Sequence, residues 1–351
     1  MNRLDHIQKT LLQNIRDNFL LNDVSFVLLD YNSSDGLEDW IQQDLGEYID
    51  LGILTYYKTL TPQVYNRSHS RNMVFKLANS KLVCNLDADN YLGKGFASFM
   101  TNEFNTHDDT IFYTSDLYTR DIVGRVVLQK EDFLNVKGYN EIFSGYGFED
   151  VELIYRLKEK GLQHKFFYER KYYDAIVHSH KERLSEESMS KNLDKIYLSY
   201  ISPYETEFLL LKKDSTFEKG LLVNNIHLNA NSKDSSQECF WRSFDEKSQV
   251  ILLDAVEGSW VEYNEYVVFL GKDNESKVIK KEGNKLLYES SVFYEFVGAD
   301  NIIFFSFLLI GAKNFKQYTD FKKGKEEINS NGFGKGIVYK NFDYSNPIQI
   351  L

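Results

Sequence analysis

Residues 81–90 read KLVCNLDADN, and this stretch decides the fold. Its first six residues are mostly apolar and predict one short, buried strand of a parallel sheet. Asp87 and Asp89 follow directly, with a single alanine between them. Acidic residues at a strand end are a functional signal, because α/β sheets bind ligands at the carboxyl ends of their strands.

The same order of elements precedes this stretch. Residues 24–29 (VSFVLL) predict a buried strand that ends at Asp30, and residues 36–49 predict a helix after it. A further strand is expected at 53–57 and a further helix at 67–77. Because strands and helices alternate, we expect an α/β sheet with acidic residues at two of its strand ends.

Composition and charge exclude several classes of protein. The chain has 351 residues, and 42% of them are hydrophobic, which is enough for a packed core and too much for a disordered chain. The 41 Lys and Arg residues are outnumbered by 52 Asp and Glu, which gives a formal charge of −11. We therefore expect no nucleic-acid partner, because phosphate contacts need a basic surface.

Cysteine use and hydropathy favour a soluble, cytoplasmic protein. Cys84 and Cys239 match no metal-finger spacing, and two cysteines are too few for a disulfide scaffold. The first residues, MNRLDHIQKT, form a charged amphipathic pattern and not a signal peptide. The most apolar run, residues 302–310, has about half the length of a membrane span.

The pattern changes after about residue 200. Residues 185–201 predict a helix that ends before Pro203. The segments beyond it predict strands at 250–253, 265–270 and 276–287 and a helix at 304–323. Strands and helices no longer alternate there. We therefore expect an α/β domain at 1–205 and an α+β accessory module at 206–351.

The Asp87-Ala88-Asp89 motif suggests a metal site. Two carboxylates on one loop can share Mg²⁺ or Mn²⁺, and the cation can then neutralise a diphosphate. The alternative is a turn in which the carboxylates cap backbone N–H groups. An EF-hand loop is excluded, because Leu92 and Ser98 stand where glycine and glutamate are required.

A second motif is the segment 143–157, which contains Gly145, Tyr146 and Gly147. The glycines allow a tight turn around the aromatic ring, and Glu149 and Asp150 then begin a helix. A carboxylate held there can act as a general base towards a hydroxyl group. Plain helix capping explains the two acids but not the glycines.

A third motif is the pair His178 and His180, which ends the apolar run AIV. Histidines on one side of a strand suit a metal ligand, although a lone histidine in such a place is usually structural.

The order of these motifs resembles a known family. Together they resemble glycosyltransferase family 2, with the GT-A fold, and in the later half the metazoan β-1,4-galactosyltransferases. The matching segments are residues 2–7 (NRLDHI), 65–68 (YNRS), 87–89 (DAD), 145–150 (GYGFED) and 177–179 (VHS). The resemblance implies a Rossmann-like mixed sheet that binds a nucleotide sugar.

The resemblance implies a set of donor contacts. Tyr65 would stack on uracil, and Arg67 would approach the base or the phosphate. Asp30 would hydrogen-bond the uridine, and Asp87 would hold the ribose. Arg3, in the first matching segment, is a further substrate-binding candidate.

The metal site and the acceptor site follow from the same resemblance. Asp89 and His178, with His180 as a further candidate, would bind Mn²⁺ or Mg²⁺. Asp150 would be the catalytic base. The remaining expected contacts are to sugars: Tyr146 lining the donor and acceptor cleft, Glu149 binding sugar hydroxyls and Gly124 letting the backbone approach the acceptor.

Three departures from the family pattern stand out. Ala175 replaces a methionine metal ligand, and Val151 replaces an aspartate that contacts the acceptor. The family has a strand before its Asn-Arg segment, whereas here Met1 directly precedes Asn2. Without that central strand we expect exposed sheet edges and weaker nucleotide binding.

The implied activity is an inverting, metal-dependent transfer of a hexose or N-acetylhexosamine from a UDP-sugar. The implied acceptor is a hydroxyl of a glycan or lipid-linked glycan, in bacterial surface polysaccharide synthesis. The enzyme would work in the cytoplasm or at the inner face of the membrane. The residues leave the donor sugar, the linkage and the oligomeric state open.

Two alternatives stay open. A sugar nucleotidyltransferase also uses strand-end carboxylates, but it predicts a glycine-rich loop near the first strand. Residues 332–336 (GFGKG) are far from that strand in sequence and lack the Ser or Thr of a P-loop. The other alternative is a glycan-binding or scaffold protein derived from a transferase.

Overall fold

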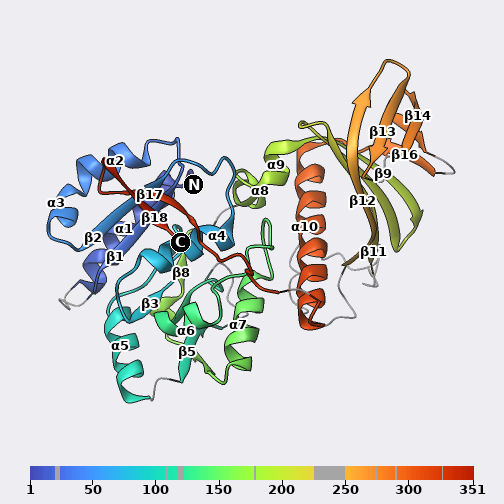
Figure 1. Cartoon of the computed structure of the whole chain (residues 1–351). Helices are drawn as coiled ribbons and strands as arrows, with labels where there is room; N and C mark the ends of the chain where they lie inside the picture. Colours follow the sequence, from blue (N-terminus) through green and yellow to red (C-terminus); the bar gives the residue numbers. More distant parts are fainter. Residues whose placement is uncertain are drawn as a thin grey trace. The chain divides into compact units, whose positions relative to one another are not determined.

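The computed structural model describes residues 1–19, 24–107, 110–116, 122–177, 179–224, 250–272, 275–288, 291–325 and 327–351 (Figure 1). These form two compact units. The first comprises Met1–Ser144, Phe148–Ser179 and Glu327–Leu351, and the second comprises Gly145–Gly147 and His180–Glu326. The division expected between residues 205 and 206 therefore lies near residue 180 in the structure. The C-terminal segment belongs to the first unit and not to the accessory module.

The first unit contains a sheet with the strand order β1-β2-β17-β18. β1 (Phe26–Tyr31) and β2 (Leu54–Thr59) are parallel, as expected for buried apolar runs joined through helices. β17 (Gly336–Lys340) pairs antiparallel with β2, and β18 (Asp343–Ile350) completes the sheet. The C-terminal hairpin is a contribution to this sheet that the sequence pattern did not predict.

A second sheet of this unit carries the acidic motif. Its order is β3-β6-β5-β7, with β3 at Leu82–Cys84, β6 at Val126–Gln129, β5 at Ile111–Ser115 and β7 at Gln163–Phe167. The pairing is mixed, since β5 is parallel to β7 but antiparallel to β6. β4 (Asn90–Tyr91) follows the acidic motif directly in sequence and pairs antiparallel with the short strand β8 (Asp174–Ala175). The expected α/β fold with a mixed sheet is confirmed.

The helices of the first unit cover these sheets. They are α1 (Leu4–Asn18), α2 (Leu37–Asp44), α3 (Gly46–Asp50), α4 (Arg67–Leu77), α5 (Phe96–Thr106), α6 (Lys130–Asn135), α7 (Glu149–Glu159) and the short 3₁₀ helix η1 (Arg170–Tyr172). One apolar cluster joins both sheets, because it contains Phe26 of β1, Leu54 of β2 and Val127 of β6. The two sheets therefore pack against one shared hydrophobic core.

β1 and β3 are each the last strand of their sheet among the described residues. Every open sheet ends in such strands, so the exposed edges expected from the sequence stay a prediction.

The second unit is built around a closed barrel. Its strands are β9 (Leu193–Ser202), β10 (Glu205–Lys212), β11 (Thr216–Asn224), β12 (Val250–Glu262), β13 (Tyr266–Gly271), β14 (Ser276–Glu282), β15 (Lys285–Tyr288) and β16 (Ser291–Glu295). The ladder closes where β16 pairs with β9. An apolar cluster that includes Phe217, Phe269 and Phe293 forms the interior. Among the described residues the interior of the barrel is thus filled by packed apolar side chains.

Helices complete this unit. α10 (Ala299–Lys322) packs on the barrel, where Phe305 and Leu309 share a cluster with Leu198 of β9. Two short helices, α8 (His180–Leu184) and α9 (Ser188–Asn192), precede the barrel. No helix among the described residues is long and apolar enough to span a membrane.

The helix expected at 185–201 is wrong for most of its length, because β9 occupies Leu193–Ser202. Tyr197 of β9 belongs to the interior cluster of the barrel, whereas Ile196 and Leu198 pack with α10. A strand buried on both faces has a continuous apolar run, and periodicity does not separate such a run from a buried helix.

Candidate active site

The candidate site begins with two arginines on α4. Asn66 caps this helix, because its side chain accepts a hydrogen bond of 2.9 Å from the backbone N–H of His69. The cap fixes where the helix starts and places Arg67 and Arg71 on the same face, since residues four apart are neighbours on a helix.

Arg71 lies at the centre of a cluster of carboxylates. Its Nη2 donates to both oxygens of Asp87 at 3.0 Å, and its Nη1 lies 2.7 Å from Oδ1 of Asp150. Glu149 is 3.6 Å from the same Nη1 and 3.7 Å from Arg67. The structure thus joins the acidic motif after β3 to the first turn of α7.

The side chains of this cluster differ in their access to water. Arg71 and Glu149 are almost fully buried, with 6% and 4% of the side chain exposed, whereas Asp150 is 19% and Asp87 is 35% exposed. Buried charges are stable only when they are paired. The arginines therefore keep the acids in place, and the exposed edges of Asp87 and Asp150 remain open to a ligand.

Asp87 and Asp150 have opposite pKa shifts. Burial disfavours the charge of Asp87, but Arg71, Arg67 and hydrogen bonds from Arg71 and Asn85 outweigh it, so its pKa falls below the usual value. Burial raises the pKa of Asp150 to about 7, and the charges of Glu149 and Asp87 add to this rise, against the opposing effect of Arg71 and Arg67. One carboxylate therefore stays ionised, and the other can exchange a proton near neutral pH.

The backbone before α7 has an unusual conformation. Gly147 has φ +102°, and Phe148, the residue that precedes α7, has φ +72°. A bulky residue with positive φ is uncommon and costs free energy, and such residues occur often at functional sites. This turn brings Glu149 and Asp150 to the start of the helix, where its dipole favours negative charge.

Gly124 lies against the pair formed by Arg71 and Asp87. A Cβ atom added at this position would lie 2.4 Å from Nη2 of Arg71 and 2.9 Å from Oδ2 of Asp87. The carbonyl oxygen of Gly124 accepts a hydrogen bond of 2.9 Å from Asn85. Glycine is therefore required here by the ion pair, and the expected approach to an acceptor stays a prediction.

The fit of a divalent cation depends on the loop after β3. Asp89 is half-buried, and its Oδ1 accepts a hydrogen bond of 2.7 Å from Asn90. Among the described residues no three His, Cys, Asp or Glu side chains are close enough together to hold a metal ion. Residue 178 and the side chain of His180 lie outside the described part, so their expected role as ligands is untested. Mg²⁺ and Mn²⁺ suit oxygen ligands, and one or two carboxylates with substrate phosphates and water suffice. The half-buried carboxylate of Asp89 supplies oxygen ligands of this kind, whereas both oxygens of Asp87 accept hydrogen bonds from Arg71.

Asp30 is fully buried at the end of β1. Its Oδ1 accepts a hydrogen bond of 2.7 Å from the backbone of Ser33, and its Oδ2 accepts one of 2.8 Å from the Tyr56 hydroxyl. Lys58 lies 3.6 Å from Oδ2. Asp30 thus has partners within the protein, and its expected contact with uridine stays a prediction.

Tyr65 and Arg3 also belong to the first unit. Tyr65 is half-buried, with its ring edge-on to Tyr31 at 5.9 Å and its centroid 5.8 Å from the guanidinium of Arg67. This places the two proposed donor contacts beside each other. Arg3 precedes α1, and its carbonyl oxygen accepts the first hydrogen bonds of that helix. The substrate contacts of all three residues stay predictions.

Tyr146 belongs to the second unit. Its hydroxyl accepts a hydrogen bond of 3.0 Å from Arg183, and its ring stacks on Phe307 at 5.6 Å. Asn314 of α10 donates to the carbonyl oxygen of Gly147 at 2.9 Å. Helix α10 therefore holds this loop, and the expected role of Tyr146 in lining the cleft stays a prediction.

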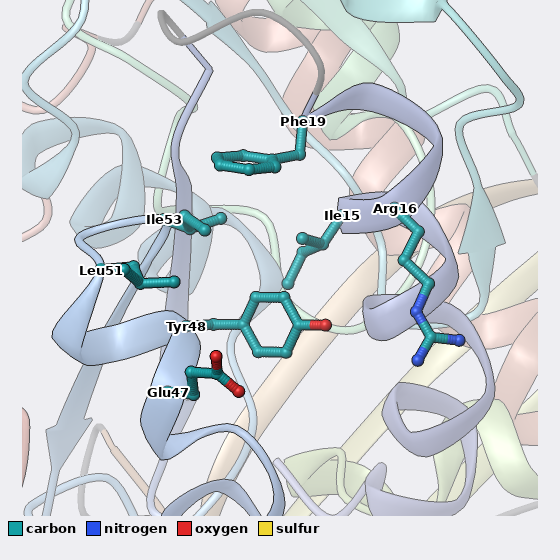
Figure 2. Close-up of a pocket in the computed structure, with 7 residues that line it drawn as sticks. All are labelled: Ile15, Arg16, Phe19, Glu47, Tyr48, Leu51 and Ile53. Atoms are coloured by element: carbon teal, nitrogen blue, oxygen red, sulfur yellow. The ribbon is translucent and has the colours of Figure 1, made fainter.

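A separate hollow of about 350 Å³ lies between the C-terminal end of α1, α3 and the segment that leads into β2 (Figure 2). Its walls are largely apolar, and they consist of Ile15, Arg16, Phe19, Glu47, Tyr48, Leu51 and Ile53. No residue that the sequence predicted for the site lines it. The hollow is therefore distinct from the carboxylate cluster.

Arg71 is the main residue of this site that sequence reasoning missed. A signal was present, because Arg67 and Arg71 are spaced for one helix face directly after an asparagine cap. The ion-pair partners of Arg71 could not be predicted from local spacing, since Asp150 is 79 positions away in the sequence.

A family model described as the N-terminal domain of galactosyltransferase matches residues 113–180. The matched segment contains Gly124, the turn at Gly145–Gly147, the acids Glu149 and Asp150 and both histidines. The expected resemblance to galactosyltransferases is confirmed for this segment. Residues 113–180 are therefore similar to a galactosyltransferase domain. A comparison with curated protein sequences gives no significant match.

Three solved structures of glycosyltransferases are similar to part of this chain. One is a mannosyltransferase of Pyrobaculum calidifontis in complex with GDP-mannose and Mn²⁺, with 16% identity and a TM-score of 0.43. The similarity covers 52% of this chain and 57% of the mannosyltransferase chain.

Two others are structures of Drosophila β-1,4-galactosyltransferase 7. The one with manganese, UDP-galactose and xylobiose has 15% identity and a TM-score of 0.32, and covers 46% of this chain and 74% of that one. The one with xylobiose has 14% identity and a TM-score of 0.29, and covers 51% and 90%. All three scores are low, so the similarity to glycosyltransferases rests on the matched segment at 113–180.

Proposed function

We propose that this chain transfers a hexose or N-acetylhexosamine from a UDP-sugar to a hydroxyl of a glycan, with inversion and with a divalent cation. The observation that carries the proposal is the largely buried position of Asp150 beside Arg71. This carboxyl group is largely buried at the start of α7, 2.7 Å from Arg71, and its pKa is raised to about 7. A group with this pKa can accept a proton at neutral pH and is not too weak a base to do so.

The proposed reaction has one nucleophilic displacement. The acceptor oxygen attacks the anomeric carbon, Asp150 takes the hydroxyl proton at a carboxylate oxygen, and the bond from the anomeric carbon to the diphosphate oxygen breaks. A Mn²⁺ or Mg²⁺ ion held by Asp89, with Asp87 close in sequence, would neutralise the departing diphosphate. Arg71 holds Asp150 and Asp87 in place before substrate arrives.

The donor contacts follow from the same site. Tyr65 and Arg67 lie beside each other at the start of α4, and we propose that they bind the uracil and the phosphate or base. We propose Arg3 and Asp30 as further donor contacts, and Glu149 and Tyr146 as sugar contacts. His178 and His180 are proposed as additional metal ligands.

For the acceptor we propose a class of substrate and no particular molecule. A glycan or lipid-linked glycan is the substrate class that the galactosyltransferase resemblance supports. Synthesis of a bacterial surface polysaccharide in the cytoplasm is the setting in which we propose that the enzyme works.

The test separates binding from transfer. UDP is titrated calorimetrically into the full chain with Mn²⁺ and then with EDTA, for the wild type and for the variants Asp89→Ala and Asp150→Asn. We expect Mn²⁺-dependent binding that Asp89→Ala abolishes and Asp150→Asn retains. Asp39→Asn, which changes an exposed carboxylate on α2, is the matched control.

Transfer is then measured with a panel of UDP-sugars and glycan acceptors. We expect loss of transfer in Asp150→Asn at unchanged UDP affinity. Near-normal turnover in this variant would refute the assignment of the base. A folded wild type that binds no UDP with Mn²⁺ would refute the whole proposal.

A further inference from the structure

Arg125 is a buried arginine that the proposed reaction does not use. It follows Gly124, directly precedes β6 and is only 1% exposed. Its guanidinium lies over the rings of Phe96 and Phe167, at 5.6 and 5.8 Å. A charged group in such surroundings costs free energy unless it is well bonded. The hydrogen bonds of the Arg125 guanidinium therefore indicate which segments it stabilises.

The guanidinium of Arg125 bonds the loop that carries the acidic motif. Nη2 donates to the carbonyl oxygen of Tyr91 at 2.9 Å and to Oδ1 of Asn90 at 3.2 Å. Nη1 donates to the carbonyl oxygen of Tyr172 at 2.5 Å. One side chain thus ties together the segment after Asp89 and the turn that precedes β8.

The bond to Asn90 continues to Asp89. The Nδ2 of Asn90 donates to Oδ1 of Asp89 at 2.7 Å. Arginine can only donate, and an ionised carboxylate can only accept. The amide between them therefore has only one orientation that satisfies both, with its oxygen towards Arg125 and its nitrogen towards Asp89.

We infer that Arg125 and Asn90 are positioning residues that fix the rotation of the Asp89 carboxylate for a divalent cation. The hydrogen bond to Oδ1 sets the plane of the carboxylate and thereby the direction of its second oxygen. This inference rests on the proposed function, in which Asp89 is a metal ligand. Groups that orient a metal ligand commonly change metal affinity by 10- to 100-fold when they are removed.

The chain offers a control that holds the same loop by its backbone. Asn14 of α1 donates to the carbonyl oxygen of Asn90 at 2.9 Å and accepts from the backbone N–H of Leu92 at 2.7 Å. Like Asn90, it is 1% exposed. Neither of these bonds involves the Asp89 side chain. Asn14→Ala therefore loosens the loop without removing the contact to the carboxylate.

The experiment measures Mn²⁺ binding directly. Free Mn²⁺ is followed by electron paramagnetic resonance as the ion is titrated into the full chain with saturating UDP. For Asn90→Ala and Arg125→Met we expect an Mn²⁺ dissociation constant about 10- to 100-fold higher than in the wild type. In the double variant we expect no further increase, because both residues act through one chain of bonds. For Asn14→Ala we expect an unchanged constant.

Each other outcome contradicts the inference. An unchanged constant in folded Asn90→Ala overturns it, and so does an equal loss in Asn14→Ala, which would indicate a general effect of loop order. If Asn90→Ala does not fold, Asn90→Ser keeps a hydroxyl to accept from Arg125 and is expected to show the same loss. A wild type that binds no Mn²⁺ with UDP overturns the proposed function and this inference together, whereas a wild type that binds it leaves the variants to test the inference alone.

Discussion

Removal of the Arg71 charge is expected to move the acidic limb of the pH–rate profile. Arg71 Nη1 lies 2.7 Å from Oδ1 of Asp150, so the centres of charge are about 4 Å apart. At that separation the attraction is worth about 1 kcal/mol in water and about 4 kcal/mol at an effective dielectric constant of 20. Since 1.36 kcal/mol corresponds to one pH unit, the pKa of Asp150 is expected to rise by about 1 to 3 in Arg71→Gln.

The direction of the change in kcat/KM follows from the proposed role of Asp150 as the catalytic base. Asp150 must be deprotonated to accept a proton, so kcat/KM falls as the pH drops below its pKa. With a wild-type pKa of about 7, a rise of one pH unit lowers kcat/KM at pH 7.5 about threefold, and a rise of two lowers it about 25-fold. Activity in Arg71→Gln is expected to recover as the pH is raised above the new pKa.

The assay is the initial rate of transfer across pH 5.5–10, a range set by the roughly 3-unit span expected for the shift. Arg71→Lys keeps the positive charge and is expected to keep the limb closer to its wild-type position. Because Arg71 also pairs with Asp87, UDP affinity and thermal unfolding are measured for each variant. A folded Arg71→Gln with its acidic limb at the wild-type pH would refute the electrostatic reasoning.

Three further predictions follow from other contacts. In the wild type, kcat/KM is expected to fall about tenfold per pH unit below pH 7, because Asp150 has a pKa of about 7; a profile flat down to pH 5 would contradict this. Gly124→Ala is expected to lower UDP affinity and transfer at least about tenfold, because its Cβ would displace Arg71 and Asp87. Gly46→Ala is the control, because a Cβ atom added there has no atom within 4 Å. Equal activity of the two variants would contradict the prediction. Asn72→Ala is expected to lower the free energy of unfolding by about 2–4 kcal/mol, because the fully buried amide donates to the carbonyl oxygen of Tyr139 at 2.8 Å and accepts from its N–H at 2.7 Å. Denaturant unfolding measures this loss against that of Asn102→Ala, which changes an exposed residue. A loss no larger than that of the control would contradict the prediction.

Local pattern predicted the parts of the site that lie at the ends of single elements. The apolar run at 81–86 placed Asp87 after a strand, and the glycine turn placed Glu149 and Asp150 at the start of a helix. Both predictions needed only neighbouring residues, because burial of one face and the helix dipole act locally.

The pairing of distant residues could not be predicted in this way. Arg71 pairs with Asp150, and β17 pairs with β2, across long stretches of intervening chain. These contacts depend on the tertiary arrangement, for which one sequence carries no direct signal. The same limit explains β9, whose apolar residues face both the barrel interior and α10.

The return of the C-terminal segment to the first unit has a consequence for biosynthesis. β17 and β18 complete the sheet of β1 and β2, and Lys76 of α4 donates to the carbonyl oxygen of Phe333. Domains generally fold as units while the chain emerges from the ribosome. The second unit ends at Glu326 and β17 begins at Gly336, so the sequence of the second unit is complete before this hairpin has been translated. The first unit, although its sheet begins near the N-terminus, is therefore expected to gain its last two strands only after the whole of the second unit has been translated.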